Sequence, residues 1–170
     1  DTCDAILVGS GTLLADDPSL NARFEGGEDP VPVVLDSGLR ISADARLLSI
    51  DKKAVIYCAS DAPERSLPAD VVRVPRAGEG LDLHVVMADL LGRDIHHLLV
   101  EGGGRVHRSF LDADLVDRIE LFVAPKVLAG GPGWVGGGPY RLADAPQFRF
   151  LSAELMGDDM HLVLERVRGA

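Results

Sequence analysis

Short apolar runs without polar alternation are the feature that most restricts the fold of this chain. The runs lie at residues 5–9, 32–36, 54–58 and 98–100. Apolar residues at helical spacing occupy residues 82–93 and 105–115. Strands that read as near-continuous apolar runs are typical of parallel sheets buried on both faces. The alternation of strands and helices therefore predicts an α/β layer structure with a mixed, mostly parallel sheet.

The last third of the chain has a different pattern. Residues 119–124 form another apolar run, and residues 148–156 and 160–167 flank a Gly-Asp-Asp turn at 157–159. This pattern predicts a terminal antiparallel hairpin, which we expect on one edge of the sheet. Neither repeats nor low-complexity segments interrupt the sequence, so its 170 residues predict a single domain.

Charge and cysteine content narrow the classes of function. With 17 basic and 27 acidic residues the net charge is −10, which argues against general nucleic-acid binding. No apolar window is long enough to span a membrane, so we expect no membrane partner. Cys3 and Cys58 lie in apolar runs without metal-ligand spacing, which predicts free thiols in a reducing cytoplasm and no metal site.

The most specific local feature is the sequence that follows residues 98–100. Glu101 is followed by three glycines at 102–104 and then by the helix-like residues 105–115. The amino end of a helix offers unpaired N–H groups and a partial positive charge, and glycines let a phosphate approach the backbone. We therefore expect an anion site here, although a strand-to-helix turn without a ligand fits the same residues equally well.

Two residues near this turn have alternative interpretations. Glu101 ends a strand, where open α/β sheets bind ligands, so it could accept a hydrogen bond or act as an acid or base. A solvated or helix-capping carboxylate is the alternative. Trp134, in the glycine-rich residues 130–138, could anchor a lid or simply cover apolar surface.

Two other strand ends carry polar side chains. Residues 5–9 are followed by Thr12, Asp16 and Arg23, and residues 32–36 are followed by Ser37. Their alternative interpretation is a capped turn and a surface arginine. If the carboxyl ends of these strands meet the glycine turn along one edge of the sheet, they build a crevice of the kind that holds ligands.

Taken together, these strings resemble the reductase domain of the bifunctional riboflavin-biosynthesis deaminase/reductase, in the dihydrofolate-reductase-like superfamily. The resemblance extends from about residue 3 to residue 167, and it is carried by residues 4–12, 15–18, 34–37, 100–104, 109–111, 115–117 and 124–126. It implies a three-layer fold with a mixed sheet flanked by helices. It also implies NADPH-dependent reduction of 5-amino-6-(5-phosphoribosylamino)uracil to its ribitylamino product, in a cytoplasmic homodimer.

The resemblance also implies roles for individual residues. Leu20, through its backbone, Arg23 and Glu101 would contact the substrate, with Glu101 beside the reacting ribose. The NADPH contacts would come from Thr12, Asp16, Ser37, Gly103, Gly104, Arg105, Val106, His107, Arg108 and Ser109. Arg105 and Arg108 would favour NADPH over NADH by charge-assisted hydrogen bonds.

The chain departs from the family pattern in two respects. In the family a further strand and helix precede the residue equivalent to Asp4, so we expect residues 1–170 to form a single reductase domain that lacks them. The zinc signature of the deaminase, His-x-Glu with a later Pro-Cys-x-x-Cys, does not occur in these residues, so we expect no deaminase domain here. Two alternatives stay open: a reductase of the same fold that acts on a related pyrimidine ribotide or a pterin, and a non-catalytic nucleotide-binding module.

Overall fold

The computed structural model describes residues 3–22, 27–131 and 133–168. Its first part alternates strands and helices: β1 (Ala5–Gly9), α1 (Ser10–Asp16), β2 (Val31–Leu35), β3 (Val55–Ala59), β4 (Asp70–Val74), α2 (Leu83–Gly92) and β7 (Leu98–Val100). A short 3-10 helix, η1 (Arg46–Ser49), and a two-residue ribbon, β5 (Arg76–Ala77) with β6 (Gly80–Leu81), lie in the connections. None of the helices in these described ranges is long and apolar enough to cross a membrane.

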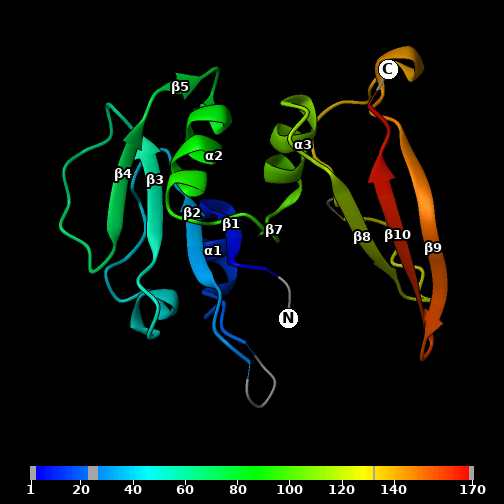
Figure 1. The fold of residues 1–170 in the computed structure, drawn as a ribbon, viewed down its shortest axis with the longest axis horizontal. Helices are drawn as coiled ribbons and strands as arrows, with labels where there is room; N and C mark the ends of the chain where they lie inside the picture. The colour runs from blue at the N-terminus through cyan, green and yellow to red at the C-terminus, as the bar shows by residue number, and fades with distance from the viewer. Residues whose placement is uncertain (1–2, 23–26, 132, 169–170) are drawn as a thin grey trace.

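The strands of this first part form a five-stranded sheet in the order β4-β3-β2-β1-β7 (Figure 1). All four pairings are parallel, with Gly9 opposite Leu35 and Leu7 opposite Val100. Every residue of β3 is buried, as its continuous apolar run predicts. Because the strands are parallel, their carboxyl ends meet along one edge.

Helices cover both faces of the parallel sheet. One face packs against α2 and α3 (Gly104–Asp112), with Val86, Leu90 and Phe110 in the core. The other face packs against α1 and η1 through Leu13 and Leu47. The three-layer α/β fold with a mostly parallel sheet is thus confirmed.

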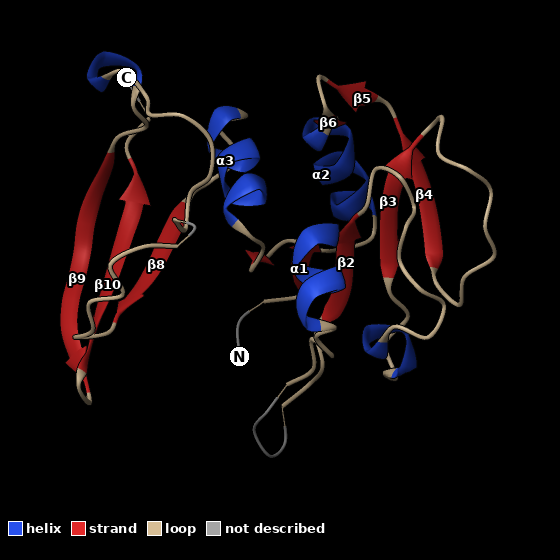
Figure 2. Cartoon of the chain, turned by 180° about the vertical axis from the view of Figure 1, so that it is seen from behind, coloured by secondary structure: helices blue, strands red, loops and turns tan. Residues whose placement is uncertain are grey.

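The last part of the chain forms a second sheet. Strands β8 (Arg118–Val123), β9 (Phe148–Met156) and β10 (Asp159–Arg166) pair antiparallel in the order β8-β10-β9, so the terminal hairpin is confirmed. The sequence predicted that this hairpin lies on one edge of the parallel sheet, and that part of the prediction is wrong. The hairpin pairs with β8 in a separate sheet. Helix α3 lies between the two sheets in both views (Figures 1 and 2).

Two cysteines are present as free thiols. Cys58 lies in β3, between β2 and β4, and is completely buried. Burial raises the pKa of the Cys58 thiol, against a smaller opposing effect of the Arg73 guanidinium. A thiol with a raised pKa carries little of the reactive thiolate, so Cys58 is chemically inert in the folded sheet.

A polar network ties α2 to the centre of the parallel sheet. The hydroxyl of the fully buried Tyr57 donates to Asp89 Oδ2 at 2.7 Å, and Arg93 Nε donates to the same oxygen at 2.7 Å. Arg93 also donates to Asp70 Oδ2 at 3.1 Å. Burial opposes ionisation of Asp89, but the hydrogen bonds from Arg93 and Tyr57 outweigh it and lower the pKa of that carboxyl.

Replacing Asp89 with alanine is expected to lower the free energy of unfolding by about 1–3 kcal/mol, because the buried Tyr57 hydroxyl loses its acceptor. The folded-state pKa of Asp89 lies below its ordinary value of about 4, so this stabilisation is present above about pH 4 and is lost as the pH falls further. Urea unfolding at pH 7 and pH 3 measures both effects. Tyr57→Phe is the matched control, and it should cost less than Asp89→Ala because Asp89 keeps Arg93 as its partner.

Candidate active site

The carboxyl edge of the parallel sheet brings the predicted strand ends together. Glu101 follows β7, Ser10 follows β1 and Asp36 follows β2, and these three strands are neighbours in the sheet. Glu101 is exposed, and its N–H donates to the carbonyl oxygen of Leu7 in β1 at 2.9 Å, which fixes its backbone against the adjacent strand. The convergence that the sequence predicts is therefore present.

Thr12 connects α1 to the glycine turn. Its Oγ1 accepts a hydrogen bond from the N–H of Gly103 at 3.0 Å, although the two residues are 91 positions apart in the sequence. Helix α3 begins directly after Gly103, which has no side chain to cap it. The N–H groups of Gly104 and Arg105, the first two of α3, have no intrahelical acceptors and thus start beside the Thr12 hydroxyl.

The glycine-rich segment, residues 130–138 without Pro132, which lies outside the described residues, contacts the start of α3 through Gly133, Val135 and Gly136. The N–H of Gly136 donates to the carbonyl oxygen of Gly104 at 2.8 Å. A Cβ added to Gly104 would lie 2.7 Å from both the oxygen of Gly133 and the nitrogen of Gly136. Only glycine permits this approach of two backbones, so the segment forms one wall of the site.

The same segment is held further along α3. Arg108 donates through Nε to both carboxylate oxygens of Asp112, at 2.9 and 2.8 Å, and through Nη1 to the Gly138 carbonyl at 2.6 Å. Its guanidinium lies 4.0 Å from the centre of the Tyr140 ring, whose hydroxyl donates to Asp112. Burial opposes ionisation of Asp112, but hydrogen bonds from Tyr140 and Arg108 lower the pKa of that carboxyl. The described contacts of the Arg108 side chain therefore hold the glycine-rich segment against α3.

Several of the predicted site residues use their side chains for contacts within the protein. The Leu20 side chain is buried in the core, which leaves only its backbone for the predicted ligand contact. Val106 packs its side chain against Gly9 and Gly102. Ser109 Oγ donates to the Arg105 carbonyl at 3.0 Å, within the helix. Arg105 itself is exposed.

The remaining predicted residues flank the glycine turn. Asp16 is exposed at the end of α1, one helical turn from Thr12 and on the same face. The Ser37 carbonyl accepts from the N–H of Ala59 at 3.2 Å, which ties the ends of β2 and β3. Arg23 lies outside the described residues, so its role stays a prediction.

The sequence places Asp36 and Arg40 at the end of the second strand, but it did not predict the cluster that they form at this edge. The carboxylate of Asp36 is completely buried and accepts hydrogen bonds from the backbone N–H groups of Arg40 and Ile41 and from Arg40 Nε at 3.2 Å. Arg40 Nη2 also donates to Ser10 Oγ at 2.6 Å. The cluster joins the ends of β1 and β2, and an arginine four residues after a strand-ending aspartate was the available signal.

Replacing Gly104 with alanine is expected to displace the glycine-rich segment and to lower the free energy of unfolding by about 1–3 kcal/mol, as overpacking does. A lower free energy of unfolding would be informative, because helix propensity alone favours alanine over glycine by about 1 kcal/mol. Gly92→Ala, at the end of α2, is the matched control: a Cβ there meets nothing within 4 Å. Thermal unfolding should show a loss for Gly104→Ala and none for Gly92→Ala.

The fold and the site define the chain as a three-layer α/β protein in which polar strand ends meet the glycine turn at the carboxyl edge of the parallel sheet. Residues 1–162 match the RibD C-terminal domain, and the chain belongs to this family. Within the described residues, no group of three or more His, Cys, Asp or Glu side chains is placed to hold a metal ion.

Named relatives support this assignment. The chain is 34% identical to the riboflavin biosynthesis protein RibD of Actinobacillus pleuropneumoniae, over 93% of this chain and 45% of that protein. It is 33% identical to the 2,5-diamino-6-ribosylamino-4(3H)-pyrimidinone 5′-phosphate reductase of Methanothermobacter thermautotrophicus, over 93% of this chain and 77% of that protein. The chain thus spans about half the length of the RibD relatives that it matches.

The fold also matches a solved structure. The diaminohydroxyphosphoribosylaminopyrimidine deaminase/5-amino-6-(5-phosphoribosylamino)uracil reductase of Thermotoga maritima superposes with a TM-score of 0.83 at 25% identity. The match covers 97% of this chain and 46% of that structure. The sequence resemblance to a riboflavin-biosynthesis reductase domain is therefore confirmed at the level of the family.

Proposed function

We propose that this chain catalyses the NADPH-dependent reduction of 5-amino-6-(5-phosphoribosylamino)uracil to the ribitylamino compound in riboflavin biosynthesis. The observation that carries the proposal is the contact of Thr12 with Gly103, which joins two separate motifs beside the uncapped start of α3. The names of the relatives and of the Thermotoga maritima structure supply the reaction class.

The residues at this edge fit an anionic dinucleotide. Residues 102–109 contain two arginines and no carboxylate, and their helix start offers free N–H groups. We assign the phosphates to the residues from Gly103 to Ser109, with the N–H groups of Gly104 and Arg105 as backbone donors, because those of Gly103, Val106 and His107 already donate within the protein. Thr12, Asp16 and Ser37 are further contacts of the coenzyme. When bound, NADPH would supply the hydride, while the protein holds the two reactants together and excludes water.

We place the substrate on the opposite side of the glycine turn from this phosphate site. Glu101 is exposed at the end of β7, where it can accept a hydrogen bond from the ribose or move a proton there. The Leu20 backbone and Arg23 complete the proposed substrate site, with Arg23 at the substrate phosphate.

We assign the preference for NADPH to Arg105, because the Arg108 guanidinium already binds Asp112 and Gly138. Arg105→Gln should weaken NADPH binding by about tenfold, the effect of one charge-assisted hydrogen bond, and leave NADH binding unchanged. Fluorescence titration of both coenzymes measures this. Arg118→Gln, on β8, is the control, and equal weakening of both coenzymes by Arg105→Gln would contradict the assignment.

A second substrate is favoured by one of the relatives. The protein from Methanothermobacter thermautotrophicus is named for the 2,5-diamino-pyrimidinone phosphate, which differs from the uracil compound in the base. Parallel assays with both ribotides separate the two candidates, because the coenzyme and the ribose chemistry are the same.

The test of the function is NADPH oxidation by the intact protein in the presence of the aminouracil ribotide. Substrate-dependent oxidation is the expected result. NADPH binding without oxidation of either ribotide would favour a different substrate, such as a pterin, or a non-catalytic nucleotide-binding module. Absence of both binding and oxidation would overturn the proposal.

We also propose that a further strand, with its helix, completes this domain by pairing with β7 and β8. Both are edge strands of their own sheets, and Leu99 and Phe122 expose large apolar side chains there. An open edge is a template for another strand. Hydrogen exchange tests this: amides of β7 and β8 should be more protected in the intact protein than in residues 1–170 alone.

The remaining partner and location assignments follow the resemblance. We propose a cytoplasmic homodimer, with neither nucleic acid nor membrane as a partner. The antiparallel sheet supports the dimer because it exposes large apolar side chains, among them Phe150, Leu155 and Met156. The free cysteines are typical of a reducing compartment. Light scattering of Leu155→Lys and wild-type protein tests the interface, and an unchanged mass would contradict it.

A further inference from the structure

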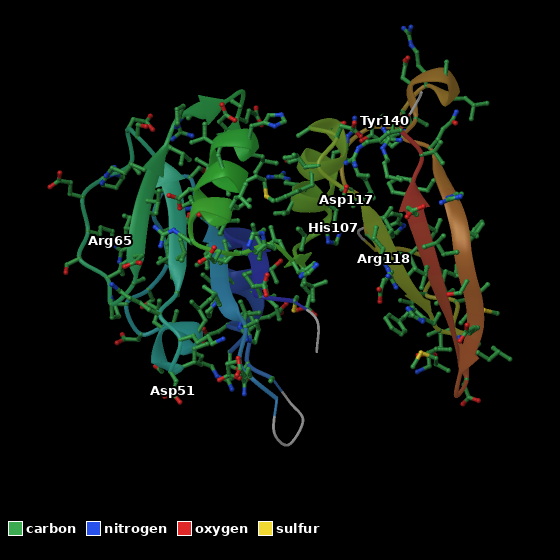
Figure 3. All side chains as sticks on the ribbon, in the orientation of Figure 1. Asp51, Arg65, His107, Asp117, Arg118 and Tyr140 are labelled. Carbon is green, nitrogen blue, oxygen red and sulfur yellow. The ribbon has the colours of Figure 1, made fainter. Side chains whose placement is uncertain are left out.

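His107 connects two parts of the site through both of its ring nitrogens. Nδ1 lies 2.6 Å from the carbonyl oxygen of Trp134, in the glycine-rich segment. Nε2 lies 3.2 Å from the carbonyl oxygen of Val100, the residue before Glu101. The ring therefore bridges the end of β7 and the segment that covers the start of α3 (Figure 3).

The chemistry of the two partners decides the state of the ring. A carbonyl oxygen only accepts hydrogen bonds, so each ring nitrogen must carry a proton to bond its partner. Neutral imidazole carries one N–H and leaves the other nitrogen lone pair facing an oxygen. Only the imidazolium form donates to both carbonyls at once, and such charge-assisted bonds are the stronger kind.

We propose that His107 is a positioning residue whose imidazolium form ties the glycine-rich segment to the end of β7 and so sets the wall of the phosphate site. Deprotonation releases one of the two bonds and loosens the segment. The tie itself stands on the geometry alone; its effect on coenzyme affinity rests on the proposed function.

The ionisable groups around the His107 ring decide whether another residue could make the tie depend on pH. Residues 130–138, which form the segment, contain no ionisable side chain. On α3, Arg108 is paired with Asp112, and Arg105 is exposed. From β7, Glu101 is the adjacent carboxylate, and Tyr140 beyond the segment binds Asp112. The described elements packed around the ring thus contain no other histidine.

Trp134 makes the tie directly observable. It is the single tryptophan of the chain, and its ring centre lies 6.3 Å from that of His107. We would label the intact protein with 5-fluorotryptophan, assign the Trp134 fluorine resonance with Trp134→Phe, and titrate from about pH 5 to 8, where imidazoles change charge. The resonance should move with pH in the wild type and in His84→Gln, an exposed histidine on α2, but not in His107→Gln.

The Glu101→Gln variant tests whether the neighbouring Glu101 carboxylate causes the change in the Trp134 resonance. In this variant the resonance should move with pH as it does in the wild type. A wild-type resonance that does not move, or one that moves equally in His107→Gln, would overturn the tie. Glutamine offers one donor group that does not titrate, so His107→Gln keeps a pH-independent bond and guards against the loss of folding that alanine risks.

The second measurement is the dissociation constant for NADP⁺ of His107→Ala relative to the wild type. Taking the ratio at each pH cancels the titration of the coenzyme itself. We expect a ratio of about 2 to 10 below pH 6, the effect of one hydrogen bond, and a smaller ratio at pH 8. A ratio independent of pH would contradict the role of the imidazolium. If the wild type binds no NADP⁺, the proposed function fails, and the fluorine titration alone decides the tie.

Discussion

Replacing Glu101 with glutamine is expected to lower the kcat for ribotide reduction by about 100-fold or more and to change NADPH affinity little. Glutamine keeps the size and the hydrogen-bonding oxygen of Glu101 but cannot take or give a proton, and positioned acid–base groups contribute about 10²–10⁴ in rate. The backbone of Glu101 is fixed to Leu7 and its side chain is exposed, so the fold should not change.

Steady-state kinetics and coenzyme titration separate the two roles of this residue. Glu79→Gln, an exposed glutamate in the turn between β5 and β6, is the control and should leave both parameters unchanged. If Glu101→Gln weakened NADPH binding as much as turnover, the substrate-side role would be wrong. A rise in KM at constant kcat would restrict Glu101 to substrate binding.

Replacing Asp36 with alanine is expected to lower the free energy of unfolding by about 3 kcal/mol or more. Its buried carboxylate is the acceptor for the N–H groups of Arg40 and Ile41, and each buried donor left unsatisfied costs about 1–3 kcal/mol. The same bonds hold Leu39 at a φ of +49°, a left-handed conformation that is costly for a leucine. The turn that follows β2 should therefore be lost, together with the contact of Arg40 with Ser10 at the end of β1.

Urea unfolding of the intact protein measures this change. Asp61→Ala is the matched control, because Asp61 also binds an arginine, Arg76, but both side chains are well exposed. Exposed pairs contribute less than about 1 kcal/mol. Asp36→Asn should fall between the two variants, since the amide retains one acceptor oxygen. Equal costs for Asp36→Ala and Asp61→Ala would show that burial of the carboxylate does not matter.

The apolar runs predicted most of the parallel sheet. The predicted run at residues 5–9 coincides with β1, and the runs at 32–36 and 54–58 differ from β2 and β3 by one residue each. These strands are buried on both faces, so each one requires a continuous apolar run that the sequence displays. The ribbon of β5 and β6 was missed, because two-residue strands leave no periodic pattern.

The site was predictable where backbone chemistry alone sets it. Glycines after an apolar run indicated the turn at Gly103, and the strand order then placed Thr12 beside it. The packing of residues 130–138 on α3 was not predictable, because glycines carry no side-chain pattern that names their partner. Arg108 was assigned to phosphate by its charge. Its pair with Asp112 follows from helical spacing, whereas Tyr140 became its neighbour only through the tertiary fold.

The buried thiol of Cys58 is a chemical probe for the opening of the parallel sheet. A maleimide or a disulfide reagent reaches it only when β3 separates from β2 or β4, so its labelling rate follows the opening equilibrium of that sheet. The glycine-rich segment contains no cysteine, and its movements leave that rate unchanged. Cys58 labelling and Trp134 fluorine spectra therefore record two separate motions, unfolding of the scaffold and rearrangement of the site wall, within one molecule.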